Sequence, residues 1–168
     1  GVFFAVWAPN ATSAYVIGDF NGWDENKNPL EKMVDHGIFT TFIPGVKEGD
    51  MYKFLLHTPD GNKLYKADPF ATYAELRPGT ASRVYDLGHF IWEDEEWVTK
   101  RDKKNVFKQP MAIYECHIGS WMRHPVPDND GFYTYREFAD RIVDYLKEMR
   151  FTHIEFMGIA EHPFDGSW

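Results

Sequence analysis

Two side chains in the first third of the sequence combine the type and the spacing needed to hold a polyhydroxylated molecule. Trp23 follows the pair Asn21-Gly22, a strong turn signal that should leave its indole near the surface. An aromatic face at the surface can stack on the apolar C–H face of a sugar ring. Lys53 alternates with apolar neighbours, so it faces the opposite side of the expected strand and could donate to hydroxyl groups. The alternative for Trp23 is packing against another domain.

A second group of polar and aromatic side chains follows two strands expected in the last third of the sequence. Residues 111–117 and 152–156 are short apolar runs that predict strands. In (β/α) barrels the active site forms at the carboxyl ends of such strands, so these side chains are expected to line a pocket wall. They are His117, Trp121, Glu161, His162 and Trp168. For Glu161 and His162, a loop held by local hydrogen bonds is an equally weighted alternative.

No residue of this region is expected to be catalytic or to bind a metal. Glu115 and Glu155 lie within the expected strands, where side chains alternate between the barrel interior and the helix layer, so structural roles are expected. Cys116 and His117 lack the paired spacing of a metal site, and a buried thiol is the default for Cys116. We therefore expect no metal and no cofactor.

Residues 1–88 are expected to form an all-β, immunoglobulin-like sandwich. Short strands of alternating or β-rich composition are separated by Gly, Pro, Asn and Asp, the pattern of antiparallel sandwiches. The expected strands cover about 2–7, 14–17, 38–43, 51–57, 63–65 and 82–85. Trp7 is expected in the core or at a contact between domains.

Residues 89–110 read as a charged linker, and residues 111–168 as a parallel β-α-β unit. Thr134 and Glu137 form a capping box that begins the helix. Its apolar face is Phe138, Ile142, Tyr145, Leu146 and Met149. A two-stranded parallel sheet does not stand alone, and a complete (β/α)8 barrel needs about 250 residues. The unit is therefore interpreted as the truncated start of such a barrel.

Bulk properties exclude several classes of partner. The chain has 18 Lys and Arg against 26 Asp and Glu, a net charge of −8, so nucleic acid and anionic membranes are not expected as partners. A single cysteine rules out an intramolecular disulfide and fits a reducing, cytoplasmic setting. No apolar run is long enough to span a bilayer. Nothing in the sequence indicates the oligomeric state.

Several motifs give the chain a resemblance to a known family. Residues 4–11 (FAVWAPNA), 18–23 (GDFNGW), 52–54 (YKF) and 66–69 (KADP) resemble the glycogen-binding module, of the carbohydrate-binding family 48 type, in glycogen branching enzymes. Residues 113–121 (IYECHIGSW), 151–155 (FTHIE) and 161–168 (EHPFDGSW) resemble the first two barrel strands of these enzymes and the loop after the second. Trp23 and Lys53 match sugar-contacting positions of the wider module family, but the second Trp that some relatives carry near residues 61–63 is absent.

The resemblance implies an α-amylase-family glycosyltransferase acting in glycogen synthesis. Such an enzyme opens an α-1,4 link through an Asp nucleophile and a Glu acid/base, and transfers the chain to a 6-hydroxyl to make an α-1,6 branch. In this family both carboxylates come from later barrel strands, beyond Trp168. The chain is therefore expected to be inactive by itself and at most to bind α-glucan.

Two rival interpretations stay open. A debranching-type hydrolase could use the same scaffold, but the run at residues 161–168 favours the branching enzyme. A non-catalytic α-glucan-binding protein would need only the sandwich, and the β-α-β unit argues against it.

Overall fold

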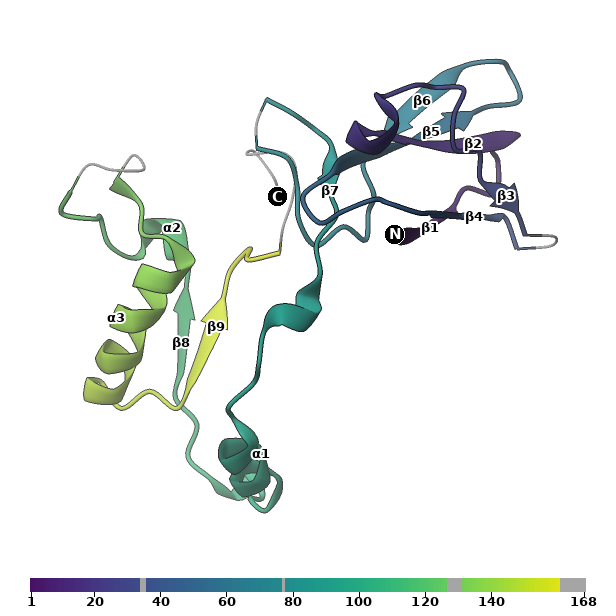
Figure 1. Cartoon of the computed structure of the whole chain (residues 1–168). Helices are drawn as coiled ribbons and strands as arrows, with labels where there is room; N and C mark the ends of the chain where they lie inside the picture. The colour runs from purple at the N-terminus through teal and green to yellow at the C-terminus, as the bar shows by residue number, and fades with distance from the viewer. Residues whose placement is uncertain (34–35, 77, 127–130, 161–168) are drawn as a thin grey trace. The chain divides into compact units, whose positions relative to one another are not determined.

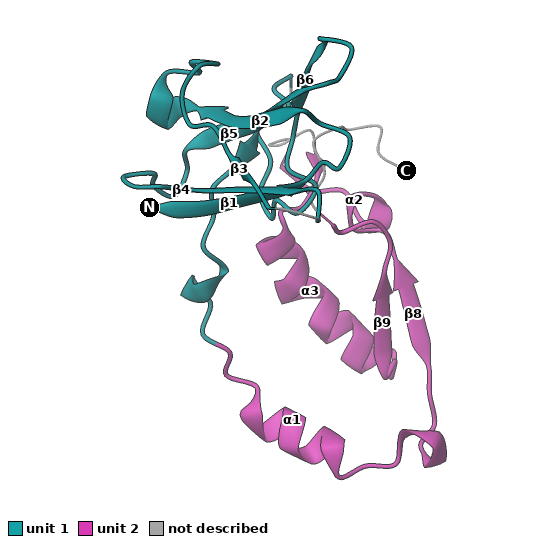
Figure 2. Ribbon diagram, turned by 90° about the vertical axis from the view of Figure 1, so that its right-hand side faces the viewer, with its two compact units in different colours: residues 1–91, 161–168 teal, residues 92–160 magenta. Residues whose placement is uncertain are grey.

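The computed structural model describes residues 1–33, 36–76, 78–126 and 131–160 (Figure 1). Residues 1–91 form one compact unit and residues 92–160 another (Figure 2). None of the described helices is long and apolar enough to cross a bilayer.

The first unit consists of two antiparallel sheets. One has the strand order β1-β4-β3; the other has the order β2-β5-β6, with β7 also paired to β5 (Figure 1). The strands are β1 (Val2–Trp7), β2 (Ser13–Gly18), β3 (Glu31–Lys32), β4 (Ile38–Ile43), β5 (Met51–His57), β6 (Lys63–Lys66) and β7 (Ser82–Arg83). The short strand β3 was not expected from the sequence, because its two charged residues carry no apolar alternation.

The two sheets share one core, so the expected sandwich is confirmed. Phe4 and Phe39 from the first sheet and Val16, Tyr52 and Phe54 from the second belong to a single buried cluster. The rings of Phe4 and Tyr52 meet edge-on, with centroids 5.0 Å apart. Burying each such side chain stabilises the folded state by about 1.5–3 kcal/mol. Because the buried side chains come from both sheets, this burial holds the two sheets together.

One polar pair enters this core. The Tyr52 hydroxyl donates to Asp68 Oδ2 over 2.7 Å. The Asp68 backbone N–H in turn donates to the hydroxyl of the buried Ser82 over 2.8 Å. Burial, followed by the hydrogen bond to Asp68, raises the pKa of Tyr52, so this hydroxyl stays protonated and keeps donating. The pair fixes the loop after β6 against β5 and β7.

The structure corrects the placement of Trp7. Its side chain is 70% exposed, so the core interpretation is wrong. Residues on a strand alternate between faces, and Trp7 shares the outer face of the first sheet with Phe3, while Phe4 points inward. The sequence pattern separates the two faces of β1 but does not show which one is buried, because both faces carry large apolar side chains.

In the second unit, strand β8 (Ile113–Cys116) lies parallel to β9 (His153–Phe156), with Ile113 opposite His153 and Cys116 opposite Phe156. Helix α3 (Tyr135–Glu148) connects them, after the short helix α2 (Ile118–Trp121). Helix α1 (Glu95–Asp102) lies in the segment expected to be a charged linker. The 3-10 turns that lie wholly within the described residues are η1 (Asp19–Asn21), η2 (Leu87–His89) and η3 (Val106–Lys108).

Helix α3 begins and packs as its sequence predicts, except at its end. The Thr134 hydroxyl accepts from the Glu137 N–H over 3.3 Å, and the Glu137 carboxylate accepts from the Thr134 N–H over 2.9 Å. Phe138 and Ile142 are buried with Cys116. Met149 is exposed, because the helix ends at Glu148 and the apolar face ends with it.

Strand β5 is the central strand of its sheet, and we predict that its buried Phe54 contributes strongly to the stability of the fold. Phe54→Ala should lower the free energy of unfolding by about 3–5 kcal/mol, because it removes a ring and leaves a cavity. Phe54 is 0% exposed. Urea unfolding followed by circular dichroism measures the change. Phe42→Ala is the matched control, since Phe42 is 60% exposed and should contribute less than about 1 kcal/mol. Equal losses in the two variants would contradict this assignment of the core.

Candidate functional site

Trp23 stands on a turn whose backbone is left-handed at two successive residues. Gly22 has φ 68° and Trp23 has φ 61°. Glycine adopts this conformation freely, whereas in a residue with a side chain it costs roughly 1–2 kcal/mol. A bulky residue held there is rare, and such strain gathers at functional sites. The Trp23 side chain is 37% exposed, so part of the indole is open to a ligand.

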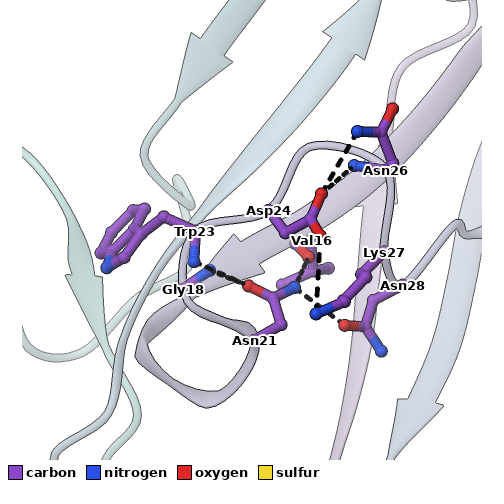
Figure 3. A network of polar contacts seen from close by, with 8 residues as sticks. All are labelled: Val16, Gly18, Asn21, Trp23, Asp24, Asn26, Lys27 and Asn28. Carbon is purple, nitrogen blue, oxygen red and sulfur yellow. Dashed lines mark hydrogen bonds and ion pairs between the residues drawn. The ribbon is translucent and has the colours of Figure 1, made fainter.

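Asn21 organises this turn through its side-chain amide. Its Oδ1 accepts from the backbone N–H groups of Gly18 and Trp23, over 3.0 and 3.1 Å. Its Nδ2 donates to the Val16 carbonyl over 3.0 Å and to Asn28 Oδ1 over 2.8 Å. Figure 3 shows the indole of Trp23 directed away from this network. The amide therefore fixes the backbone under the indole and leaves the ring unobstructed by the network.

Lys53 lies on the same sheet as the start of the Trp23 turn. It is opposite Ile17 on β2, and its neighbour Tyr52 is opposite Gly18. Because Tyr52 points into the core, Lys53 points to the outer face. Its ammonium donates to the Thr80 hydroxyl over 2.6 Å. Thr80 was not singled out from the sequence, since 27 residues separate it from Lys53.

A second exposed aromatic, Tyr65, lies on the outer face that carries Lys53. Tyr65 is opposite Leu55 on β5, two residues from Lys53 and therefore on its face. Residues placed diagonally in this way lie about 7–8 Å apart. Tyr65 is 47% exposed. The sequence interpretation did not single it out, although the order Lys63-Leu64-Tyr65 would have placed Lys63 and Tyr65 on one face.

Glu25 connects the segment after Trp23 to strand β6. Its carboxylate accepts hydrogen bonds from the Tyr65 hydroxyl and from the Lys63 ammonium, the latter over 2.5 Å. These bonds, that from Lys63 first, lower the pKa of Glu25. The partners lie 38 and 40 residues from Glu25, so local spacing gave no signal for them. The segment after Trp23 is thus held to β6 as well as to β2.

The structure describes two of the five residues expected at a pocket wall, His117 and Trp121. His117 lines a hollow of about 210 Å³ together with Tyr133 and Gly158, at the carboxyl ends of β8 and β9. Its Nδ1 lies 3.1 Å from the Ser120 hydroxyl. Trp121 does not line this hollow: its ring packs edge-on to Phe138, and its Nε1 donates to the Tyr114 hydroxyl over 3.2 Å.

Three further residues expected at the pocket wall, Glu161, His162 and Trp168, lie outside the described residues. Among the residues that are described, no three His, Cys, Asp or Glu side chains gather as a metal site would require. The free thiol Cys116 is buried, and burial raises its pKa.

The ion pair at Glu25 predicts a pH response that can be measured directly. Lys63→Met should raise the pKa of Glu25 toward its ordinary value, because its main hydrogen-bond donor is lost while Tyr65 stays. In the unaltered chain the folded-state pKa is the lower one. The pair therefore contributes stability above the unfolded-state pKa and loses it as the pH falls through the folded-state pKa.

An NMR titration of the Glu25 carboxyl carbon measures this pKa. Lys27→Met is the matched control, because Lys27 pairs with Asp24 over 3.5 Å and not with Glu25. An unchanged Glu25 pKa in Lys63→Met would contradict the pairing.

Comparisons with known proteins agree with the fold and identify the proteins that this chain resembles. The model of the family described as carbohydrate-binding module 48 (isoamylase N-terminal domain) matches residues 1–71. The 1,4-alpha-glucan branching enzyme GlgB of Butyrivibrio fibrisolvens is 64% identical over 168 residues, which are all of this chain and 26% of that protein. GlgB of Halothermothrix orenii is 50% identical, again over all of this chain and 26% of its own length.

Solved structures show the same fold. The apo pullulanase of Paenibacillus barengoltzii superposes with a TM-score of 0.64 at 21% identity, over 96% of this chain and 26% of that one. The same enzyme in complex with maltohexaose and alpha-cyclodextrin superposes with a TM-score of 0.65. The chain spans about a quarter of the length of the curated relatives it matches. Residues 1–71 match the model of the carbohydrate-binding module 48 family, and the whole chain is similar to about a quarter of the length of the GlgB branching enzymes.

Proposed function

We propose that this chain is the glycan-binding module and the first part of the catalytic barrel of a cytoplasmic 1,4-α-glucan branching enzyme. The observation that carries the proposal is the partly exposed Trp23 ring on a rigid turn that follows β2, in a sheet whose outer face carries Lys53 and Tyr65. These three residues lie within the segment that matches the carbohydrate-binding family. The ligand is an α-glucan such as glycogen.

The outer face of the β2-β5-β6 sheet has the groups that sugar recognition requires. Trp23 and Tyr65 offer aromatic faces for the apolar sides of glucose rings. A lysine ammonium has three donors, and Thr80 accepts one from Lys53, so the others can reach sugar hydroxyls. Tyr65 takes the role that the absent tryptophan near residues 61–63 has in some relatives. Two aromatic platforms, Trp23 and Tyr65, suit a glucan chain better than a single sugar.

The binding face can be tested by removing one ring. Trp23→Ala should weaken the binding of maltoheptaose by about tenfold, or about 1.4 kcal/mol, because the stacking surface is lost. Isothermal titration calorimetry gives the affinity, and co-sedimentation with glycogen gives an independent measure.

The control for this variant is Trp97→Ala. Trp97 is another exposed tryptophan, 60% exposed, but it lies on α1 in the second unit. Its removal should leave maltoheptaose binding unchanged. If Trp23→Ala binds as the unaltered chain does, Trp23 is not part of the site.

The second unit supports the proposal of a catalytic barrel. Strands β8 and β9 are parallel and are joined by a helix, which is the repeating unit of (β/α) barrels. Beside α3 lies an apolar hollow of about 340 Å³, lined by Phe138, Ile142, Ile154 and Phe156 among others. In a complete barrel, further βα units would cover such a surface. The relatives, about four times as long as this chain, have the length for them.

In this proposal the chemistry of the complete enzyme is a retaining transfer. An Asp nucleophile forms a glycosyl-enzyme from an α-1,4-linked donor, and a Glu acid/base delivers the chain to a 6-hydroxyl. Both carboxylates would belong to later barrel strands. This chain would contribute the glycan-binding face and, through the hollow beside His117, part of the pocket wall.

The 168-residue chain by itself should therefore not branch amylose. The absorbance of the amylose–iodine complex, followed over time in the presence of the chain, should stay constant, because the catalytic pair is missing. An active branching enzyme added to the same amylose serves as the positive control. A fall in absorbance with the chain alone would show that a catalytic pair lies within these residues, against the proposal.

A further inference from the structure

Asp19 joins the Trp23 ring to the central strand of the sheet. One carboxylate oxygen, Oδ1, accepts from the indole Nε1–H of Trp23 over 3.0 Å. The other, Oδ2, accepts from the backbone N–H of Met51 over 2.9 Å. Asn21 fixes the backbone of Trp23, whereas Asp19 fixes the plane of its ring. The two residues therefore hold different parts of the platform.

Gly18 is what allows Asp19 to reach strand β5. A Cβ atom at position 18 would lie 2.2 Å from the Met51 carbonyl oxygen and 2.8 Å from the ring of Phe20. Only a residue without a side chain lets the turn approach β5 this closely. The Asp19 carboxylate then bridges to the backbone N–H of Met51, two residues before Lys53 on the same strand. The Asp19 bridge thus fixes the orientation of the Trp23 ring relative to β5, the strand that carries Lys53.

The bond to Asp19 also restrains the side chain of a residue whose backbone is left-handed. At φ 61°, a residue with a side chain is strained, and surrounding contacts must hold it there. An indole that could swing about its side-chain torsions would lose entropy on stacking against a sugar. The bond to Asp19 removes that freedom before the ligand arrives.

We propose that Asp19 is a positioning residue for α-glucan: it holds the Trp23 ring in the plane that stacks on glucose, at a fixed place relative to Lys53. This inference rests on the proposed glycan-binding function. It adds to that function a residue that needs no contact with sugar and acts through the indole N–H. It also explains the order of residues before the Asn-Gly-Trp turn. Gly18 lets the backbone approach β5 closely, and Asp19 then forms the carboxylate bridge to Met51.

The test measures maltoheptaose affinity and the state of the Trp23 indole together, in the 168-residue chain. Asp19→Ala should lower the affinity about tenfold and shift the Trp23 indole N–H resonance toward that of a solvent-exposed indole, with faster hydrogen exchange. Asp19→Asn keeps one oxygen acceptor, so it should lose less affinity, about threefold. It also guards the test against a failure of Asp19→Ala to fold.

Asp24→Ala is the matched control. Asp24 belongs to the same loop, but its carboxylate accepts from Asn26 and pairs with Lys27. It should leave both the affinity and the Trp23 indole resonance unchanged.

The outcomes separate this inference from the function it rests on. If the unaltered chain does not bind maltoheptaose, the glycan-binding function is wrong, and the role of Asp19 in it falls as well. If the unaltered chain binds and both Asp19 variants bind equally well, Asp19 does not position the platform, while the glycan-binding function stands. A lower melting temperature with unchanged affinity and an unchanged indole resonance would likewise assign Asp19 a structural role only.

Discussion

The structure of the first unit depends on the alternation of side chains along β5. This strand pairs with β2, β6 and β7, and it has large aromatic rings at Tyr52 and Phe54 facing the other sheet. Because successive residues face opposite ways, burial of those two rings forces Lys53 outward. A shift of one residue in the pairing would bring Lys53 into the core and expose the rings. The same hydrophobic burial that holds the sandwich together thus decides which side chains the outer face of the sheet carries.

Much of this arrangement could be predicted from the sequence, because its signals are local. Alternation placed the long strands, and the Thr134–Glu137 pair located the start of α3, with the expected bonds present. The outward direction of Lys53 also followed from its two neighbours. Alternation does not say what covers a face, however. Strand β1 has apolar residues on both sides, so Trp7 could be given to the core until the structure showed its side chain exposed.

The parts that could not be predicted are contacts between residues far apart in the chain. Glu25 meets Tyr65 across 40 residues, and Asp19 meets Met51 across 32. Neither pair has a spacing pattern, since turns and strand pairing bring them together. Trp121 shows the same limit on a smaller scale. It comes after a strand, where a loop residue was expected, but the short helix α2 turns its indole back onto Tyr114 and Phe138, where burial of a large ring is favourable.

The turn that carries Trp23 combines local backbone strain with hydrogen bonds at several points, and these bonds are what keep the strained conformation in place. A flexible loop would relax a left-handed tryptophan into an ordinary backbone conformation. Here Asn21 uses both ends of its amide, and Glu25 ties the following segment to β6, so relaxation would break several hydrogen bonds at once. The indole is consequently presented at one orientation before any ligand binds. Preorganisation of this kind reduces the entropy lost on association, which would favour stacking of the proposed glycan ligand on the ring. Under the proposed glycan-binding function, the strained backbone at Trp23 is therefore a property of the binding face and not a defect of the turn.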